Sequence, residues 1–308
     1  MVAGVAEVEV LNLLMVDEAR SRSDWEKWEM AIKSELKRLA DTHTWEVVKH
    51  PRGMNVVGCK WVFKIKRNAV GEIDKYKARL VAKGYSQVQG VDYDNTYAPI
   101  THLSSLCTIL AITAHNDWNI EVFDFHLAFL NGKLDKGEDI YMDLPPGYKT
   151  NGKYNRPVAK LLIVLYRSKQ GTLKWYLELC QMLHTLKLTR AESDWGVFYL
   201  HTGRDILLLA SHVDDCMLTG SSPSLIKAFK DEIKARYKIL DLGPVNWLLG
   251  MKVMHDQDAC TIALSQTTYI DAILTKYNFS NLKPLSIPMD PNIQLSRNQA
   301  PSSPTEAA

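Results

Sequence analysis

The spacing of apolar residues predicts that the chain is built from both helices and strands. Apolar residues three and four positions apart indicate a helix after Ser23-Asp24-Trp25-Glu26, a sequence that matches a capping box. The apolar face of this helix would contain Trp25, Trp28, Ile32, Leu36 and Leu39. Similar spacing predicts further helices at 101–115, 175–186, 222–237 and 265–277.

Short apolar or alternating runs predict the strands. They lie at 44–48, 60–66, 73–83, 118–125, 158–165, 197–201, 206–212, 247–254 and 260–264. Polar turns at 68–71 and 202–205 each join two neighbouring runs, so those runs are expected to form hairpins. The last two runs are expected to form another.

Two adjacent carboxylates lie where the run 206–212 ends. Asp214 and Asp215 separate it from a second apolar run at 216–218, and both runs are short enough to suit buried strands. Two like charges at the tip of a buried strand pair are unfavourable unless a cation neutralises them. Mg²⁺ prefers carboxylate oxygens. Because an aspartate pair is also ordinary turn chemistry, these two residues alone leave both interpretations open.

Positive charge is concentrated between residues 51 and 90. This segment has nine lysines and arginines against Glu72 and Asp74. Strand alternation predicts that two sets of cations each share a face: Lys75, Lys77, Arg79 and Lys83 on one strand, and Lys60, Lys64 and Lys66 on its partner. Such a row suits phosphates of a nucleic acid or a triphosphate. A solvated outer face guarding an edge strand is the alternative, and the scarcity of acidic neighbours favours phosphate binding.

Composition narrows the setting without identifying a function. The chain has 308 residues, enough for two or three subdomains, and a net charge of only +2. It shows no apolar run of membrane-spanning length and no secretory signal pattern. Its five cysteines form no C-x-x-C pair, so neither a disulfide framework nor a zinc site is indicated. We therefore expect an intracellular protein that is not secreted and has no membrane partner.

The order and spacing of several short segments resembles the reverse transcriptase of copia-type LTR retrotransposons, over residues 25–288. The segments are T-W-E-V-V (44–48), K-W-V-F-K-I-K (60–66), K-Y-K-A-R-L-V-A-K-G-Y (75–85), Q-V-Q-G-V-D-Y (87–93), A-F-L-N-G (128–132), L-P-P-G-Y (144–148), H-V-D-D (212–215), L-G-M (249–251) and L-S-Q-T-T-Y (264–269). The resemblance implies an α+β fold of the right-hand polymerase type, in which an antiparallel palm sheet carries the aspartate hairpin. It also implies an RNA-directed DNA polymerase domain that transfers a nucleotide from a dNTP to a primer 3′-hydroxyl.

The same resemblance divides the chain into regions. A lead-in (1–22) precedes the reverse transcriptase domain (23–288), and a tail (289–308) follows it. Within the domain, fingers are expected at approximately 23–100 and 132–164, palm at 101–131 and 165–254, and a partial thumb at 255–288. The tail has no periodicity and is rich in Pro, Ser, Asn and Gln, which predicts disorder.

The resemblance also implies roles for particular residues. Asp124, Asp214 and Asp215 would meet in the palm, where Asp124 and Asp214 bind two Mg²⁺ ions, with Mn²⁺ as an alternative, and Asp215 assists. Incoming nucleotide would be bound by Lys77, Arg79, Phe129 and Gln170, where Lys77 and Arg79 hold the triphosphate and Phe129 excludes a 2′-hydroxyl. The primer grip would be Leu248, Leu249, Gly250 and Met251. Expected partners are an RNA or DNA template-primer and dNTP. No RNase H, protease or integrase motif is found, so other polyprotein parts are expected to be absent from this chain.

Three departures from the family pattern border the expected nucleotide pocket. His212 stands where tyrosine is usual, and His126 stands where lysine is usual. The usual L-Y-G-L-K-Q-A-P-R is L-Y-R-S-K-Q-G-T-L at 165–173, so Arg167 replaces a glycine, and its long side chain is expected to crowd the pocket or distort the next helix start.

These departures leave the activity of this copy open, and three hypotheses follow. The chain is an active polymerase domain, or an inactive relic that keeps the fold and nucleic-acid binding, or a different two-metal enzyme such as a nuclease or phosphatase. The third lacks any H-x-x-x-H motif or clustered ligands beyond the three aspartates. Two single residues also have simpler alternatives to a role at the site. Phe129 could be an ordinary core residue, and His212 could be a histidine of a strand whose hydrogen bonds are made within the protein.

Overall fold

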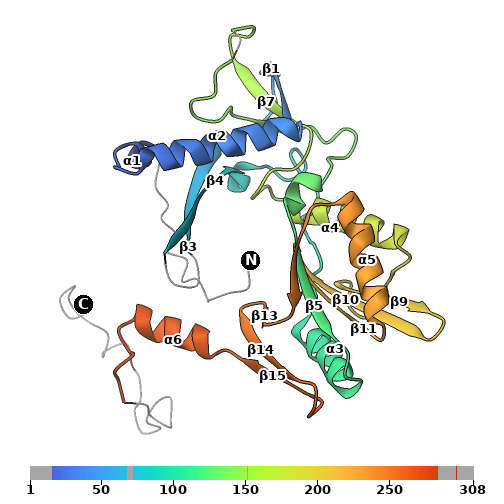
Figure 1. Ribbon diagram of the computed structural model, residues 1–308. Coiled ribbons are helices and arrows are strands. Elements are labelled where there is room, and N and C mark those ends of the chain that lie inside the picture. The colour runs from blue at the N-terminus through green and yellow to red at the C-terminus, as the bar shows by residue number, and fades with distance from the viewer. Residues whose placement is uncertain (1–15, 68–71, 151, 284–295, 297–308) are drawn as a thin grey trace. The chain divides into compact units, whose positions relative to one another are not determined.

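The computed structural model describes residues 16–67, 72–150, 152–283 and 296, and the chain divides into two compact units, 1–266 and 267–308 (Figure 1). The expected turn at 68–71, most of the lead-in and nearly all of the expected tail at 289–308 lie outside the described residues. Within the described part of the chain, helices and mainly antiparallel strands together confirm the α+β class. No helix there is long and apolar enough to cross a membrane.

The largest sheet has six strands in the order β12-β5-β11-β10-β9-β8, and all neighbours are antiparallel. Its strands are β5 (Ile120–Phe125), β8 (Thr189–Arg190), β9 (Val197–Thr202), β10 (Asp205–His212), β11 (Asp215–Gly220) and β12 (Ile239–Pro244). The hairpins expected around 202–205 and the aspartate pair are confirmed as β9–β10 and β10–β11. Strands distant in sequence therefore become neighbours, because β5 is inserted between β11 and β12.

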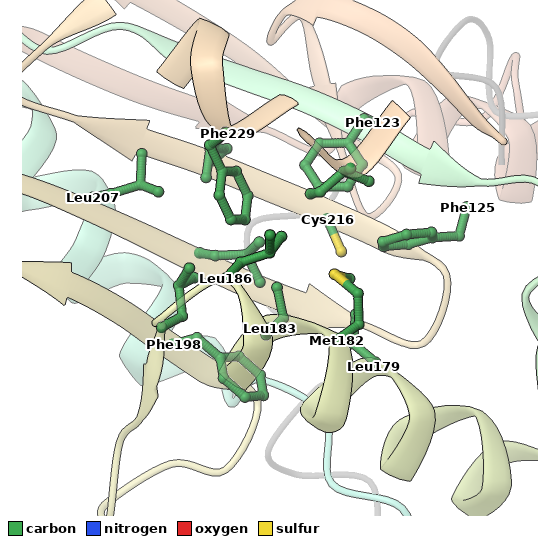
Figure 2. Packing of buried hydrophobic residues seen from close by; sticks show 14 of the residues in the cluster. Phe123, Phe125, Leu179, Met182, Leu183, Leu186, Phe198, Leu207, Cys216 and Phe229 are labelled. Atoms are coloured by element: carbon green, nitrogen blue, oxygen red, sulfur yellow. The ribbon is translucent and has the colours of Figure 1, made fainter. Parts of the chain in front are cut away.

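Both faces of this sheet are buried, which explains its nearly continuous apolar runs. One face is covered by α4 (Gly171–Thr185) and α5 (Pro223–Arg236), and Figure 2 shows Phe123 and Phe125 of β5 among residues of that cluster. Leu106, Ile109 and Leu110 of α3 (Leu103–His115) pack on the opposite face. Alternation along β5 separates the two cores, so a one-residue slip would exchange them.

A second substructure is the basic hairpin. Strands β3 (Cys59–Arg67) and β4 (Ile73–Ala82) pair antiparallel, as expected, and α2 (Trp25–Asp41) packs against β4. The Trp28 ring of α2 lies edge-on to Phe63, with ring centroids 5.1 Å apart, and this arrangement anchors the helix to the hairpin.

The start of α2 differs from the expected capping box. The N-cap residue is Asp24, and it makes no side-chain cap hydrogen bond. Its carboxylate instead accepts hydrogen bonds from Nε and Nη2 of Arg22, at 2.8 and 3.1 Å. The capping-box prediction is therefore wrong, because a charged neighbour competes for the capping group. The expected lead-in also contains a short helix, α1 (Val16–Arg20), whose Ala19 is buried in the core under α2.

The remaining sheets are smaller. One has the order β1-β7-β6-β2, from β1 (Trp45–Lys49), β2 (Val56–Val57), β6 (Tyr141–Met142) and β7 (Pro157–Leu161); only its β2–β6 pair is parallel among the described strands. The other is antiparallel and contains β13 (Trp247–Leu248), β14 (Met251–Asp256) and β15 (Thr261–Ser265). It confirms the last expected hairpin as β14–β15 and adds a tight turn between β13 and β14.

Three further elements complete the description. Two short 3-10 helices are η1 (Gly84–Ser86) and η2 (Ala128–Asn131). Helix α6 (Thr267–Lys276) begins the second unit, two residues later than the expected cap at Ser265. The thumb was expected to begin at approximately residue 255, whereas the boundary between the two units falls between residues 266 and 267. The thumb assignment stays a prediction.

Candidate active site

Three aspartates meet at one end of the large sheet. Asp215 begins β11 directly opposite Asp124 near the end of β5. The backbone N–H of Phe125 donates to the Asp214 carbonyl at 3.0 Å. Directly opposed residues on antiparallel strands have Cβ atoms about 4.5–5.5 Å apart. The convergence that the resemblance implies is thus present in the strand pairing, and all three residues are half-buried.

The turn that carries Asp214 is strained. Val213 and Asp214 connect the paired residues His212 and Asp215, and Val213 has φ 61°. A β-branched residue in the left-handed region is a genuine outlier that costs about 1–3 kcal/mol. The Trp175 indole Nε1 donates to the Val213 carbonyl at 2.7 Å, which fixes the turn against α4. Tertiary packing therefore holds the tip in a conformation that local preference opposes.

Negative charge accumulates around this tip. The pKa of Asp214 is raised, first by burial and then by the charges of Asp124 and Asp215. Burial also raises the pKa of the Cys216 thiol behind the tip, and the three carboxylates raise it further. A divalent cation is the natural counter-charge for such a group of carboxylates, so the donor chemistry fits Mg²⁺ or Mn²⁺. In the described part of the chain, however, no three His, Cys, Asp or Glu side chains already have the grouping that could hold an ion.

Arg79 of β4 lies over an aromatic residue beside the aspartates. The Arg79 guanidinium lies 5.4 Å from the ring centroid of Tyr166. Burial raises the pKa of Tyr166 to about 12, and the charge of Asp214 adds to this shift while that of Arg79 opposes it. Burial lowers the pKa of His126, two residues after Asp124, and the charge of Lys77 contributes to that shift. The expected strand parity therefore agrees with the structure for these two cations; the side chain of Lys66, also expected in the row, lies outside the description.

Phe129 lies on the same side of the site. It is half-buried in η2, and its ring centroid is 5.8 Å from that of Tyr166. It belongs to none of the three clusters of buried apolar residues. Tyr166 thus contacts both Arg79 and Phe129. This arrangement favours a role for Phe129 at the site over a role as an ordinary core residue.

Gln170 lies in a buried network of hydrogen bonds. Its side chain is only 1% exposed. Its amide nitrogen donates to the Asp92 carbonyl at 2.9 Å and to Glu138 Oε1 at 3.1 Å, and its oxygen accepts from Gln87 at 3.1 Å. These bonds engage both ends of the amide, and the expected place of Gln170 in the nucleotide pocket stays a prediction. The side chain fixes the segment 87–92 to the start of α4.

Arg167 lies on a strained backbone. Its φ is 63°, a conformation that favours the glycine usual at this position. Its side chain is exposed, and the expected crowding of the nucleotide pocket stays a prediction. A Cβ at Gly84 would lie 2.3 Å from the Arg167 carbonyl oxygen, so this backbone is tightly packed. The substitution therefore strains the backbone before α4.

The expected primer grip forms the tip of a hairpin. Leu248 pairs with Met251, and the two residues between them, Leu249 and Gly250, have φ 50° and 81°. Two positive φ values in a two-residue loop are the signature of a type I′ turn. Leu248 and Met251 are buried in the cluster that contains Val122 of β5, whereas Leu249 is 40% exposed. The turn thus presents one apolar side chain to solvent while β5 anchors its base.

A buried ion pair that the sequence patterns do not predict involves Glu35 and Arg38. Glu35 of α2 is 1% exposed, and its Oε2 accepts a hydrogen bond from Arg38 Nη1 at 2.7 Å. A signal was available, because Glu35 lies seven residues after Trp28 and four before Leu39, on the apolar face of α2. An acidic residue on an apolar helix face is rarely buried unless it is paired.

Comparisons with known proteins show the family of this chain. Residues 42–291 match a family model described as reverse transcriptase (RNA-dependent DNA polymerase). The chain therefore belongs to the reverse transcriptase family, and its antiparallel sheet with the aspartate hairpin is the palm of a right-hand polymerase fold.

Relatives place the chain among retrotransposon sequences. It is 33% identical over 90% of its length to the retrovirus-related Pol polyprotein from transposon TNT 1-94 of Nicotiana tabacum, and 35% identical over 88% to that from transposon RE1 of Arabidopsis thaliana. These matches span 21% and 18% of the two relatives, so the chain covers about a fifth of their length. The resemblance to copia-type reverse transcriptases is thus confirmed.

A solved structure of a foamy viral protease-reverse transcriptase in complex with double-stranded DNA is also similar. The match has a TM-score of 0.42 and 12% identity, and it covers 82% of this chain and 40% of that one.

Proposed function

We propose that this chain is an RNA-directed DNA polymerase domain that joins a dNTP to the 3′-hydroxyl of a primer. The observation that carries the proposal is the placement of two opposite charge groups around Tyr166. Asp124 and Asp215 lie on the palm sheet, Asp214 lies in the adjoining turn, and Arg79 of the basic hairpin stacks over the ring. Nucleotidyl transfer needs carboxylates and cationic side chains in one site. The carboxylates coordinate the metal ions, and the cationic side chains bind the phosphates.

The metal side belongs to the three aspartates. The site would hold two divalent ions, Mg²⁺ or Mn²⁺. Asp124 and Asp214 would both coordinate the two ions, and Asp215 would assist. When bound, these ions activate the primer hydroxyl and neutralise charge on the leaving pyrophosphate. The strained Val213–Asp214 turn, held by Trp175, keeps the Asp214 carboxylate at a set position despite like-charge repulsion.

The phosphate side belongs to the basic hairpin. Lys77 and Arg79 would contact the triphosphate through charge-assisted hydrogen bonds. They orient the α-phosphorus so that the primer 3′-oxygen forms the new P–O bond as the bond to the pyrophosphate oxygen breaks. Phe129 would pack under the sugar of the incoming nucleotide, and the exposed Leu249 would contact the primer strand. Gln170 acts indirectly, by fixing the segment before α4.

The expected template-primer and the remaining polyprotein parts belong to the proposal. The basic hairpin and the palm suit an RNA or DNA template paired with a primer. Because the relatives are about five times longer, the domains that act with this one in a whole polyprotein are proposed to lie outside the chain.

The inactive relic is the competing candidate, and Arg167 is the observation that bears on it. The φ of 63° strains the backbone by about 1 kcal/mol relative to glycine, and the side chain is exposed. His212 is half-buried and pairs with Asp215 in the ladder, so it leaves the sheet intact. Relief of this backbone strain by Arg167→Gly would therefore show how much the substitution weakens the site.

Primer extension tests the proposal directly. The purified chain is incubated with a primed RNA template, the four dNTPs and Mg²⁺, and extension is measured with and without EDTA. We expect metal-dependent extension that is abolished in Asp124→Asn and retained in Asp258→Asn, a charge change at an exposed turn. A folded wild-type chain that extends neither RNA- nor DNA-templated primers would reject the proposal in favour of the relic.

A further inference from the structure

An exposed lysine lies next to the aspartates at one edge of the palm sheet. Strand β12 is the outermost strand on this side of the sheet as the structure describes it, and it pairs antiparallel with β5 so that Leu240 is opposite Asp124. Two residues further along β5, the His126 backbone N–H donates to the Lys238 carbonyl at 2.9 Å. Lys238 and His126 are therefore cross-strand neighbours just beyond Asp124.

Strand alternation assigns Lys238 to the face of the sheet that carries Asp124. Ile239 and Phe125 are opposite each other, and both pack in the cluster that α4 and α5 cover. The residues on either side of Ile239 face the other way, because successive side chains of an extended chain alternate. Lys238 thus shares a face with Leu240, and Leu240 shares that face with its cross-strand partner Asp124.

This face is open to solvent around the lysine. Leu240 is 44% exposed. Lys238 is exposed too, and its ammonium makes no hydrogen bond or ion pair in the part of the chain that the structure describes. Lys234 of α5 differs, because its ammonium lies 2.9 Å from Oδ2 of Asp241. A hollow of about 370 Å³ opens at this edge, lined by His126, Lys234, Tyr237, Lys238, Ile239 and Leu240.

The position of the hollow along β5 indicates which part of a substrate it would meet. Val122, two residues before Asp124, packs in the same cluster as the base of the proposed primer grip. His126, two residues after Asp124, lies toward η2. The primer would therefore approach from the side of Val122. In an in-line displacement the leaving group departs opposite the attacking oxygen, which here is the side of His126 and Lys238.

We propose that Lys238 binds the β- and γ-phosphates of the incoming triphosphate and the pyrophosphate that they become. As the primer 3′-oxygen bonds to the α-phosphorus, the bond from that phosphorus to the bridging oxygen breaks, and its electron pair stays on the pyrophosphate. The ammonium stabilises this developing charge and keeps its own protons. The inference rests on the proposed function, because it assigns a further contact in the same reaction. The alternative is a solvated lysine without a ligand.

The same geometry gives a reason for the departure from the family pattern at His126, where lysine is usual. Positions 126 and 238 are cross-strand neighbours that line one hollow. Lys238 would therefore supply the charge that a lysine at 126 would otherwise supply. A lysine restored at 126 is expected to replace one that is lost at 238.

Calorimetric titration of the purified chain with pyrophosphate in Mg²⁺ tests the proposal without primer extension. Lys238→Gln should weaken pyrophosphate binding about tenfold, since a charge-assisted contact is lost, and Lys238→Arg should keep most of the affinity. Adding His126→Lys to Lys238→Gln should restore it. Arg236→Gln is the matched control, because it removes an exposed charge at the end of α5, two residues before Lys238.

Three results would overturn the proposal. They are a wild type that does not bind pyrophosphate, an unchanged pyrophosphate affinity in Lys238→Gln, and an equal loss of affinity in Arg236→Gln. Because Lys238 is exposed, its replacement should leave the melting temperature unchanged. A lowered melting temperature with unchanged pyrophosphate affinity would assign Lys238 to the stability of the sheet edge.

Nucleic-acid binding and primer extension complete the test. Lys238→Gln should bind a primed template as the wild type does, measured by fluorescence anisotropy. A loss confined to nucleic acid would instead assign Lys238 to backbone phosphates and overturn the proposal. If the wild type extends no primer but the difference in pyrophosphate binding persists, the polymerase proposal fails and the Lys238 site stands. Normal extension with equal pyrophosphate binding by the wild type and Lys238→Gln would have the opposite meaning.

Discussion

Asp124 and Asp215 are direct cross-strand partners in the palm sheet, where β5 runs antiparallel to β11. Their pairing brings the negative end of the proposed active site together, and the adjacent turn adds Asp214. Like charges directly opposite one another destabilise a strand pair. The site therefore stores repulsion that a bound cation would relieve, and this repulsion can be measured.

The first prediction concerns the pH dependence of stability. Because burial and the neighbouring carboxylates raise the pKa of Asp214 above 3.8, folding favours its protonated form. The stability that the protonated Asp214 carboxyl contributes to the folded state is complete below its pKa in the unfolded state. This stability is lost as the pH rises through its pKa in the folded state. Asp214→Asn should thus raise the free energy of unfolding in EDTA, more at pH 7 than at pH 5, as measured by urea denaturation.

The same variant should lose function. Primer extension should fall by about 100-fold or more, and added Mg²⁺ should raise the melting temperature of the wild type but not of Asp214→Asn. The exposed Asp258→Asn should behave as the wild type does in both assays. Equal stabilisation of the wild type and Asp214→Asn by Mg²⁺ would show that the ion binds elsewhere.

The second prediction concerns Arg79. Arg79→Ala removes the guanidinium over Tyr166 and should weaken dNTP binding about tenfold, since a charge-assisted contact to phosphate is lost. Steady-state kinetics with a fixed primer-template would show it as a higher KM. Lys49→Ala, which removes an exposed charge from β1, is the control. Normal nucleotide affinity in Arg79→Ala would remove the basic hairpin from the site.

The third prediction concerns the strained backbone at Arg167. Arg167→Gly should stabilise the protein by about 1 kcal/mol, because glycine adopts a positive φ without a steric penalty. Lys187→Gly is the matched control, since Lys187 is also exposed and has φ 65°. Both should raise the melting temperature, and only Arg167→Gly, which borders the site, should change polymerase activity. A gain in activity without a gain in stability would point to a side-chain effect.

The fourth prediction concerns sugar selection by Phe129. Phe129→Val should admit ribonucleotides, because the ring that tilts against Tyr166 would no longer fill the space beside a 2′-hydroxyl. Steric misfits of about 1–3 kcal/mol correspond to roughly 5- to 150-fold in rate. The dNTP:rNTP incorporation ratio should fall accordingly. Phe198→Val, a change in the core, should lower the melting temperature and leave the ratio unchanged. The opposite pattern for Phe129→Val would assign it to the core.

Local patterns in the sequence were sufficient for most elements and for the aspartate turn. Alternation along 73–83 predicts that Lys77 and Arg79 share a face, because successive side chains in a strand point to opposite sides. The short apolar runs around Asp214 and Asp215 predict a hairpin, and its register confirms that interpretation. These features depend on residues only a few positions apart, so they can be predicted from the sequence alone.

Only the tertiary structure determined which distant residues meet. The insertion of β5 beside β11 places Asp124 opposite Asp215, and Gln170 becomes buried through hydrogen bonds to Gln87, Asp92 and Glu138. Glu35 is buried because α2 covers β4, and it pairs there with Arg38. Burial and charge interactions arise between segments far apart in the chain, and no local period records them.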